Sequence, residues 1–143
     1  MTSVCVLEKG EAADSDRVKA AIGPNVMASV YYFYDTVHER GIEPPPFLRR
    51  IWEPYCKLVE ETPPAHRHFR THELHYTGLH RGEAEMIDEQ LIRDTCLIGT
   101  ADELVETIRG LARDGLQELI FATGNDAKWR LAEDFARQVI PRL

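Results

Sequence analysis

Histidine is the residue type in this sequence that most suggests chemistry, because five of the six histidines lie between positions 66 and 80. They are His66, His68, His72, His75 and His80. His68 and His72 are four residues apart, so a helix would place both imidazoles on one face, as a pair of metal ligands requires. However, the chain contains neither an HExxH nor a CxxC motif to complete a coordination sphere. The pattern therefore favours a solvated, partly aromatic helix and predicts no metal site.

The three cysteines, Cys5, Cys56 and Cys96, are odd in number and far apart. This spacing argues against a disulfide framework and for a reducing cytoplasm. Cys5 lies in an apolar run and Cys96 precedes another, so we expect both to be small buried hydrophobic residues. Cys56 precedes Lys57, whose charge could lower the pKa of the thiol, but packing within a helix is the better interpretation. No nucleophilic cysteine is predicted.

The composition is typical of one globular domain, since 43% of the 143 residues are hydrophobic and 29% are charged. The formal net charge is −7, which disfavours nucleic acid or an anionic membrane surface as the main partner. The apolar runs are too short to span a membrane, and the amino terminus lacks the pattern of a signal peptide. We therefore expect a cytoplasmic protein.

The clearest secondary structure lies in residues 99–143, which predict a helix, a strand and a second helix. Thr100 and Glu103 have the spacing of a capping box at the start of the first helix, and Gly115 is suited to end it. The inward face of this helix is predicted to carry Leu104, Ile108 and Leu111. The apolar run Leu119–Ala122 predicts a buried strand. The second helix is predicted to point these residues inward: Trp129, Ala132, Phe135, Ala136 and Val139.

The amino-terminal part is predicted to begin with a strand over residues 3–7 and to continue as helices. Asp14 or Ser15 can cap a short helix. Gly23-Pro24 interrupts the helical pattern, and a new helix is then predicted to run to a stop at Gly41.

The middle of the chain is predicted to be mostly helical. The Tyr31–Tyr34 run covers every face of its helix, so part of it is exposed or covered by a partner, with a structural role as the default. Residues 47–62 predict a helix bent at Pro54. A short helix is expected within residues 65–82, and a polar helix over residues 83–93.

The two predicted strands lie at opposite ends of the chain, with a long and mostly helical stretch between them. A parallel connection needs only about a dozen residues, so this one carries an insertion. Two strands alone make a poor sheet, because both outer edges keep unpaired backbone groups. The sequence therefore predicts an α/β fold that belongs to a larger assembly with further strands.

Four stretches of the sequence match a known family: Gly99–Val105, Leu111–Ile120, Leu131–Ala136 and Val139–Leu143. His72–Leu79 is similar to a histidine-rich segment of some members, and Val4–Leu7 fits a late strand. On these residues the chain resembles the C-terminal portion of the luciferase-like flavin/deazaflavin-dependent monooxygenase family (the bacterial luciferase superfamily). That family includes bacterial luciferase, alkane-sulfonate monooxygenase and methylenetetrahydromethanopterin reductase.

The resemblance implies a (β/α)8 TIM barrel, of which residues 1–143 form a single C-terminal segment with about the last two strands, their helices and a helical insertion. The implied activity is redox chemistry on a small organic substrate with FMN or deazaflavin as cofactor, as a monooxygenase or a reductase. Because six strands are absent, the chain alone is expected to bind no cofactor and to be inactive. We expect a homo-oligomer or a complementing chain.

Within such a barrel, the loops that follow the strands build the active site, and here they are Glu8–Glu11 and Thr123–Asp126. Gly124 and Asn125 are the candidates for cofactor contacts, because glycine permits close approach and the N-terminus of the following helix favours anions. The alternative, which the residue types favour, is that Asn125 or Asp126 caps that helix.

The catalytic candidates are His75 and His80, either of which could face the substrate pocket of a complete barrel. A solvated helix is the structural alternative for both. A rival function is a non-catalytic α/β accessory or interaction module that completes its sheet with a partner chain. Binding of FMN or reduced deazaflavin to the isolated chain would contradict this rival.

Overall fold

A two-stranded parallel sheet stands at the centre of the computed structural model, which describes residues 2–143. Strand β1 (Val4–Val6) pairs with β2 (Leu97–Gly99) so that Cys5 lies opposite Ile98. Both strands are apolar on both sides, which suits a sheet that is covered on both faces. The predicted α/β class is confirmed, with helix as the predominant element. The strand β2 is a finding of the structure that the sequence analysis does not identify.

The run Leu119–Ala122 is not the buried strand that its apolar sequence predicts. It meets the sheet only at the amino end of β1, through a bridge between Thr2 and Phe121. The Thr2 N–H donates to the Ile120 carbonyl (3.0 Å), and the Ala122 N–H donates to the Thr2 carbonyl (2.9 Å). The side chain of Ile120 is exposed. The prediction is wrong because an apolar run needs neighbouring strands to bury it, and within residues 2–143 this run is bridged only to Thr2, which precedes β1.

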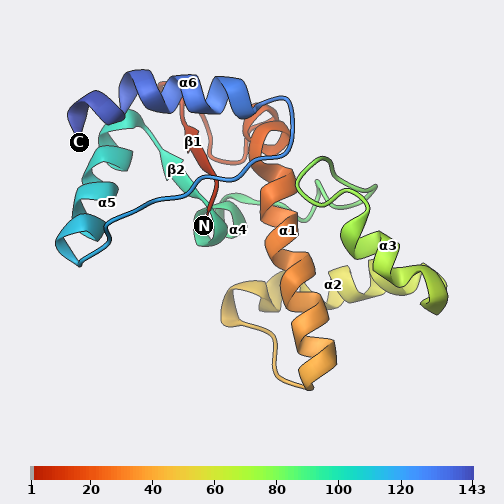
Figure 1. Cartoon of the computed structure of the whole chain (residues 1–143). Coiled ribbons are helices and arrows are strands. Elements are labelled where there is room, and N and C mark those ends of the chain that lie inside the picture. Colours follow the sequence, from red (N-terminus) through yellow and green to blue (C-terminus); the bar gives the residue numbers. More distant parts are fainter. Residues whose placement is uncertain (1) are drawn as a thin grey trace.

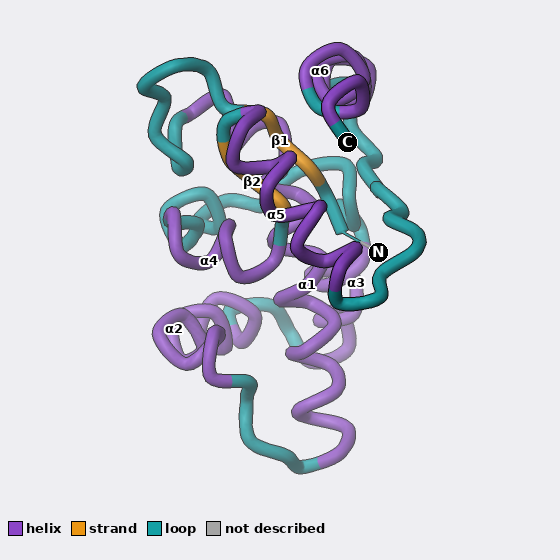
Figure 2. Tube along the Cα trace, turned by 90° about the vertical axis from the view of Figure 1, so that its left-hand side faces the viewer, coloured by secondary structure: helices purple, strands orange, loops and turns teal. Residues whose placement is uncertain are grey.

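Helices cover both faces of the sheet (Figure 1). They are α1 (Asp16–Arg40), α4 (Glu89–Thr95), α5 (Ala101–Arg113) and α6 (Lys128–Gln138). Helices α5 and α6 pack on the face that carries Val4 and Val6. Helices α1 and α4 pack on the face that carries Cys5 and Ile98. Figure 2 shows the loop between α5 and α6 swinging out past the sheet before it returns to α6.

The order of the extended segments is β2, β1 and then Leu119–Ala122. In a (β/α)8 barrel, strands that follow one another along the chain are neighbours, so that this last segment would lie beside β2. Within residues 2–143, no strand pairs with the edge of β2 that faces away from β1.

Helix α1 runs unbroken through Gly23-Pro24, so the predicted interruption is wrong. Pro24 has no N–H to donate to the carbonyl of Ala20, four residues earlier. The amide nitrogen of Asn125 approaches this turn instead, at 3.5 Å from the Ala20 oxygen and 2.9 Å from the Ala21 oxygen. A side chain from far along the chain thus supplies the missing donor and supports the continuous helix.

The helix ends that local residue types predict are confirmed for α1 and α5, whereas neither Asn125 nor Asp126 caps α6, whose N-cap is Ala127 without a side-chain hydrogen bond. The Ser15 hydroxyl accepts a hydrogen bond from the first turn of α1, and Gly41 ends that helix at φ 62°. Thr100 and Glu103 form the capping box of α5. Gly115 follows that helix with φ 99°, a conformation that glycine adopts without a Cβ clash.

The second part of the fold is the helical lobe, made of the C-terminal half of α1, α2 (Arg49–Glu60), α3 (Arg67–His72) and the turns over residues 73–88. Three short 3-10 helices complete the chain: η1 (Pro46–Leu48), η2 (Pro64–His66) and η3 (Ile140–Arg142). The predicted polar helix begins only at Glu89, because residues 83–86 form a turn and Asp88 is the N-cap.

The predicted inward face of the last helix is confirmed in part. Phe135 and Val139 are buried as predicted, whereas Trp129 is 75% exposed, and Ala132 and Ala136 are exposed too. Leu131, which the prediction omits, is also buried and lies four residues before Phe135, so it extends the same face. Local periodicity did not show that Leu131, and not Trp129, begins this face.

Candidate functional site

The clustered histidines spread over different surroundings instead of converging. His66 and His68 are exposed. The Nε2 atom of His72 lies 3.1 Å from a carboxylate oxygen of Asp35 on α1. Among residues 2–143, no group of three or more His, Cys, Asp or Glu side chains is placed to hold a metal ion.

His75 and His80, the predicted catalytic candidates, lie at the edge of a buried polar cluster in the helical lobe. We call it the Glu83 cluster, and its members are Tyr31, Tyr55, Arg70, His75, His80 and Glu83. The ring of His75 lies 6.0 Å from that of Tyr31. In the described part of the chain, Nδ1 of His75 and Nε2 of His80 are buried without a hydrogen-bond partner. His80 contacts the carboxyl group of Glu83 through its backbone N–H, whereas His75 packs beside the ring of Tyr31.

Glu83 is the centre of this cluster, and its side chain is completely buried. Its Oε2 atom accepts hydrogen bonds from the Tyr31 hydroxyl and the backbone N–H of His80, both at 2.8 Å. The Arg70 guanidinium approaches Oε1 only to 3.6 Å, which is too long for a hydrogen bond. Burial raises the pKa of Glu83 to about 7, although the Tyr31 bond and the Arg70 charge act to lower it. The carboxyl group therefore titrates near neutral pH.

Two tyrosines lie beside this carboxyl group. The rings of Tyr31 and Tyr55 stack at 6.1 Å, and both side chains are completely buried. Burial, together with the nearby Glu83, raises the pKa of both hydroxyls, so that they stay neutral. A carboxyl group near neutral pKa is suited to acid–base chemistry when substrate can touch it. Arg70 and His80 line an open groove of about 710 Å³, whereas Glu83 is fully enclosed.

The Glu83 cluster lies toward the amino ends of the two strands. A small cavity of about 40 Å³ touches Ser3, Cys96 and Tyr76, the first two at the starts of β1 and β2. The ring of Tyr76 lies 4.6 Å from that of His75. Barrel enzymes place their active sites at the carboxyl ends of the strands, so His75 and His80 lie toward the opposite end.

The candidate cofactor contacts, Gly124 and Asn125, are engaged by the protein itself. A Cβ atom on Gly124 would lie 2.9 Å from both the Cβ and the carbonyl oxygen of Tyr76, so only glycine fits this approach. The Asn125 side chain donates to α1 and accepts a hydrogen bond from the Ala127 N–H (3.0 Å), the residue that precedes α6. Both residues thus hold chain segments together in this arrangement.

The carboxyl end of β1 is closed by ion pairs. Arg17 of α1 pairs with Glu11 and donates to the Val6 carbonyl (3.0 Å). Hydrogen bonds from the Arg17 guanidinium are the main reason that the pKa of Glu11 falls to about 2. Arg130 of α6 pairs with Glu8 at 2.6 Å. The predicted loop Glu8–Glu11 is therefore tied to two helices.

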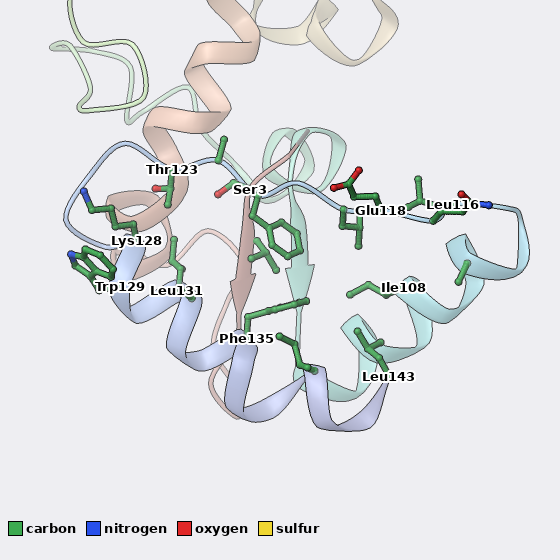
Figure 3. Close-up of a pocket in the computed structure, with 18 residues that line it drawn as sticks. Ser3, Ile108, Leu116, Glu118, Thr123, Lys128, Trp129, Leu131, Phe135 and Leu143 are labelled. Atoms are coloured by element: carbon green, nitrogen blue, oxygen red, sulfur yellow. The ribbon is translucent and has the colours of Figure 1, made fainter.

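An apolar groove of about 780 Å³ lies between α5, α6 and the segment over residues 116–123 (Figure 3). Ile108 of α5 and Phe135 of α6 point into it. Four of its large apolar lining residues are 42–75% exposed: Leu116, Trp129, Ile140 and Leu143. A concave apolar surface with exposed large side chains marks a place where another molecule or chain segment packs.

No protein-family model, curated protein or solved structure gives a significant match to this chain. Within residues 2–143, no helix has both the length and the apolar character needed to cross a membrane.

Sequence reasoning missed Glu83 and its partner Tyr31. It placed Glu83 at the start of a solvated polar helix, because a lone glutamate among charged residues carries no sign of burial. The one local hint is Gly82, which precedes it and adopts φ 88°, a value that turns the chain and excludes a helix there. Three separate segments enclose Glu83, and no local sequence pattern indicates that these segments pack together.

Proposed function

We propose that this chain is the closing segment of a luciferase-like (β/α)8 barrel, whose complete form carries out flavin- or deazaflavin-dependent redox chemistry on a small organic substrate. The observation that supports this proposal is an unfinished core, in which a sheet of two strands lies beside an apolar groove of about 780 Å³. Further strands that pack there would bury the exposed groove residues. The resemblance over Gly99–Val105 and Leu131–Ala136 supplies the family.

The chain alone does not fit either cofactor at the candidate residues. Tyr76 fills the space next to Gly124, and the Asn125 amide is used by α1 and by the start of α6. We therefore infer that residues 2–143 bind neither FMN nor deazaflavin by themselves, and that the rest of the barrel supplies those contacts. His75 and His80 then support the helical lobe and do not touch substrate.

A complete barrel requires Leu119–Ala122 to leave β1 and to pair with the free edge of β2. The attachment to β1 is slight, since it consists of one bridge at Thr2. Because the free edge of β2 offers unpaired backbone groups along the whole strand, a longer pairing there would compensate for the loss of that bridge.

The second candidate is a non-catalytic α/β accessory module, and the observed strand order favours it. Helices on both faces of a sheet whose first strand lies in the middle are typical of open α/β sheets. Such a module would complete its sheet and cover its groove with a partner chain or a second copy. The three cysteines are free, as suits the cytoplasmic location proposed for either candidate.

A chimera separates the two candidates. We would join residues 2–143 to the first six strand–helix units of a luciferase-like reductase from which the closing segment has been removed. The barrel proposal expects the chimera to bind deazaflavin or FMN, seen as a change in cofactor fluorescence, whereas the isolated chain gives no change. A matched chimera with Leu131→Asp, which places a charge in the buried stripe of α6, should lose this binding.

The position of the last extended segment provides an independent readout. Thr2→Cys with Phe121→Cys should form a disulfide in the isolated chain, because these residues are bridge partners. In the chimera, the barrel proposal expects the same pair to stay reduced, since residue 121 has moved to β2. A folded chimera that forms this disulfide and binds no cofactor would overturn the barrel proposal and support the accessory module.

A further inference from the structure

The segment over residues 73–88 is held in place by side chains more than by its own secondary structure. We call it the latch segment. Its backbone turns at Tyr76 (φ 64°) and Gly82 (φ 88°) and forms no helix of its own. Leu79 packs so closely on α1 that its Cδ1 lies 3.2 Å from where a Cβ on Gly23 would be. Docking of the latch segment therefore depends on a few specific contacts.

The polar contact that anchors the latch segment is Glu83. This carboxyl group is fully buried and joins the latch segment to α1 through the Tyr31 hydroxyl at 2.8 Å. Only one of its oxygens is hydrogen-bonded in residues 2–143, since Oε1 has no partner. The nearest cation, on Arg70, lies 3.6 Å from Oε1 and donates instead to the Arg81 carbonyl at 3.2 Å.

This geometry suits a neutral carboxyl group better than an ionised one. A buried carboxylate needs several hydrogen bonds to compensate for lost hydration, and Oε1 accepts none, with the Arg70 guanidinium beside it at 3.6 Å but beyond hydrogen-bond distance. A protonated carboxyl group carries no net charge, so its burial without a further partner costs less than that of a carboxylate. We propose that proton uptake by Glu83 docks the latch segment against α1 and α2, and that loss of this proton releases it.

The groups that face Glu83 come from every element packed around it. They are Tyr31 of α1, Tyr55 of α2, Arg70 of α3, and His75 and His80 of the latch segment itself. Arg70 favours the ionised carboxylate, but burial outweighs it and keeps the pKa of Glu83 near 7. The hydroxyls of Tyr31 and Tyr55 stay neutral, because burial raises the pKa of each. Burial thus makes Glu83 a carboxyl group whose charge state changes near neutral pH.

Release has a consequence beyond the helical lobe. Tyr76 of the latch segment packs against Gly124, in the loop that follows Leu119–Ala122. Undocking removes this contact and loosens the loop whose movement a barrel order requires. The latch itself does not depend on the proposed enzymatic function, because every group it uses lies within residues 2–143.

The experiment is a pH titration of the intact chain followed by NMR and hydrogen exchange. The side-chain carboxyl ¹³C shift of Glu83 reports its ionisation, and the exchange protection of residues 73–88 reports docking. We expect the Glu83 carbon to titrate near neutral pH, and protection to fall as the pH rises toward that value and then to level off. Protection, corrected for intrinsic exchange rates, should fall about tenfold between about pH 6 and about pH 8.

Two variants test whether Glu83 is responsible. Glu83→Gln keeps the shape and removes the titration, so protection of the latch segment should become independent of pH. Glu73→Gln removes an exposed carboxylate from the same segment and should leave the wild-type profile unchanged. The proposal fails if Glu83→Gln retains the pH-dependent loss of protection. It also fails if the wild-type Glu83 carbon titrates near its ordinary value or without a change in protection, a readout that does not depend on either variant folding.

Discussion

Apolar side chains are buried to different degrees in the helical lobe and on the groove side, which is formed by α5, α6 and residues 116–123. In the lobe, Tyr31, Tyr55 and Leu48 from α1, α2 and η1 are completely buried against one another and against α4. On the groove side, the core beside α5 and α6 is small, and Trp129 is largely exposed. The lobe is therefore complete within this chain, whereas the groove side lacks a covering element. The difference indicates that the lobe provides most of the stability, and it is the reason that we propose further structure on the groove side.

The largest expected effect is the removal of Tyr31 from the lobe. Tyr31→Ala creates a cavity and takes away the hydroxyl that binds Glu83, so we expect the free energy of unfolding to fall by about 4 kcal/mol. Tyr32→Ala is the matched control, because Tyr32 is 60% exposed on the next position of the same helix and should change stability by less than about 0.5 kcal/mol. Urea denaturation followed by circular dichroism measures both. Equal losses would show that the lobe is not the stabilising half.

The next effect is the dependence of global stability on pH. The pKa of Glu83 is about 7 in the folded protein, against an ordinary value of 4.5. Between these values the folded protein holds a proton that the unfolded chain has lost, so stability falls as pH rises through this window. The expected loss from about pH 5 to about pH 8 is about 2.5 kcal/mol.

Glu83→Gln isolates the contribution of Glu83 to the pH dependence of stability, since every other titrating group is retained. Urea midpoints measured across the same pH range should show a shallower slope for Glu83→Gln than for the wild-type protein. Parallel slopes would mean that the carboxyl group of Glu83 is ionised in the folded state. Its protonation would then contribute nothing to the free energy of unfolding.

Local chemistry in the sequence predicted the features that depend on a few adjacent residues. The capping box at Thr100, the Ser15 cap and the glycine end at Gly41 involve interactions within one turn, so residue types and spacing suffice. The α/β class also followed from the apolar run at the amino terminus and the helical periodicity after Gly99.

The features that sequence reasoning missed depend on distant partners. Helix α1 continues past Pro24 because Asn125 supplies a donor from the other end of the chain. Within residues 2–143, Leu119–Ala122 stays mostly unpaired because only Thr2, ahead of β1, is bridged to it, and Glu83 is buried because three segments close around it. Each outcome depends on the neighbour that a segment meets, which the composition of the segment does not reveal.

Two glycines test the link between the lobe and the groove side, with a smaller effect. Gly124→Ala forces a Cβ within 2.9 Å of Tyr76, so we expect a loss of about 1–3 kcal/mol. Gly110→Ala, in the middle of α5, meets only the flexible end of Arg113 at 3.8 Å and should stabilise the protein by about 0.5–1 kcal/mol. Opposite signs in thermal or urea denaturation are the expected result. A neutral Gly124→Ala would show that the latch segment does not contact the 123–126 loop.

The smallest effect on folding is expected on the groove side, where it serves to detect a partner. Trp129→Ser removes an apolar side chain that is 75% exposed, so monomer stability should change by less than about 0.5 kcal/mol. If the groove is covered in an assembly, the same change should weaken association, because a buried tryptophan contributes strongly to interfaces. Sedimentation velocity over a concentration series of the wild-type chain and of the variant measures this. Arg137→Ser, on an exposed position of the same helix, is the control. If Trp129→Ser destabilises the monomer as much as a buried substitution does, this end of the groove already belongs to the folded core, and the contrast between the two halves is lost.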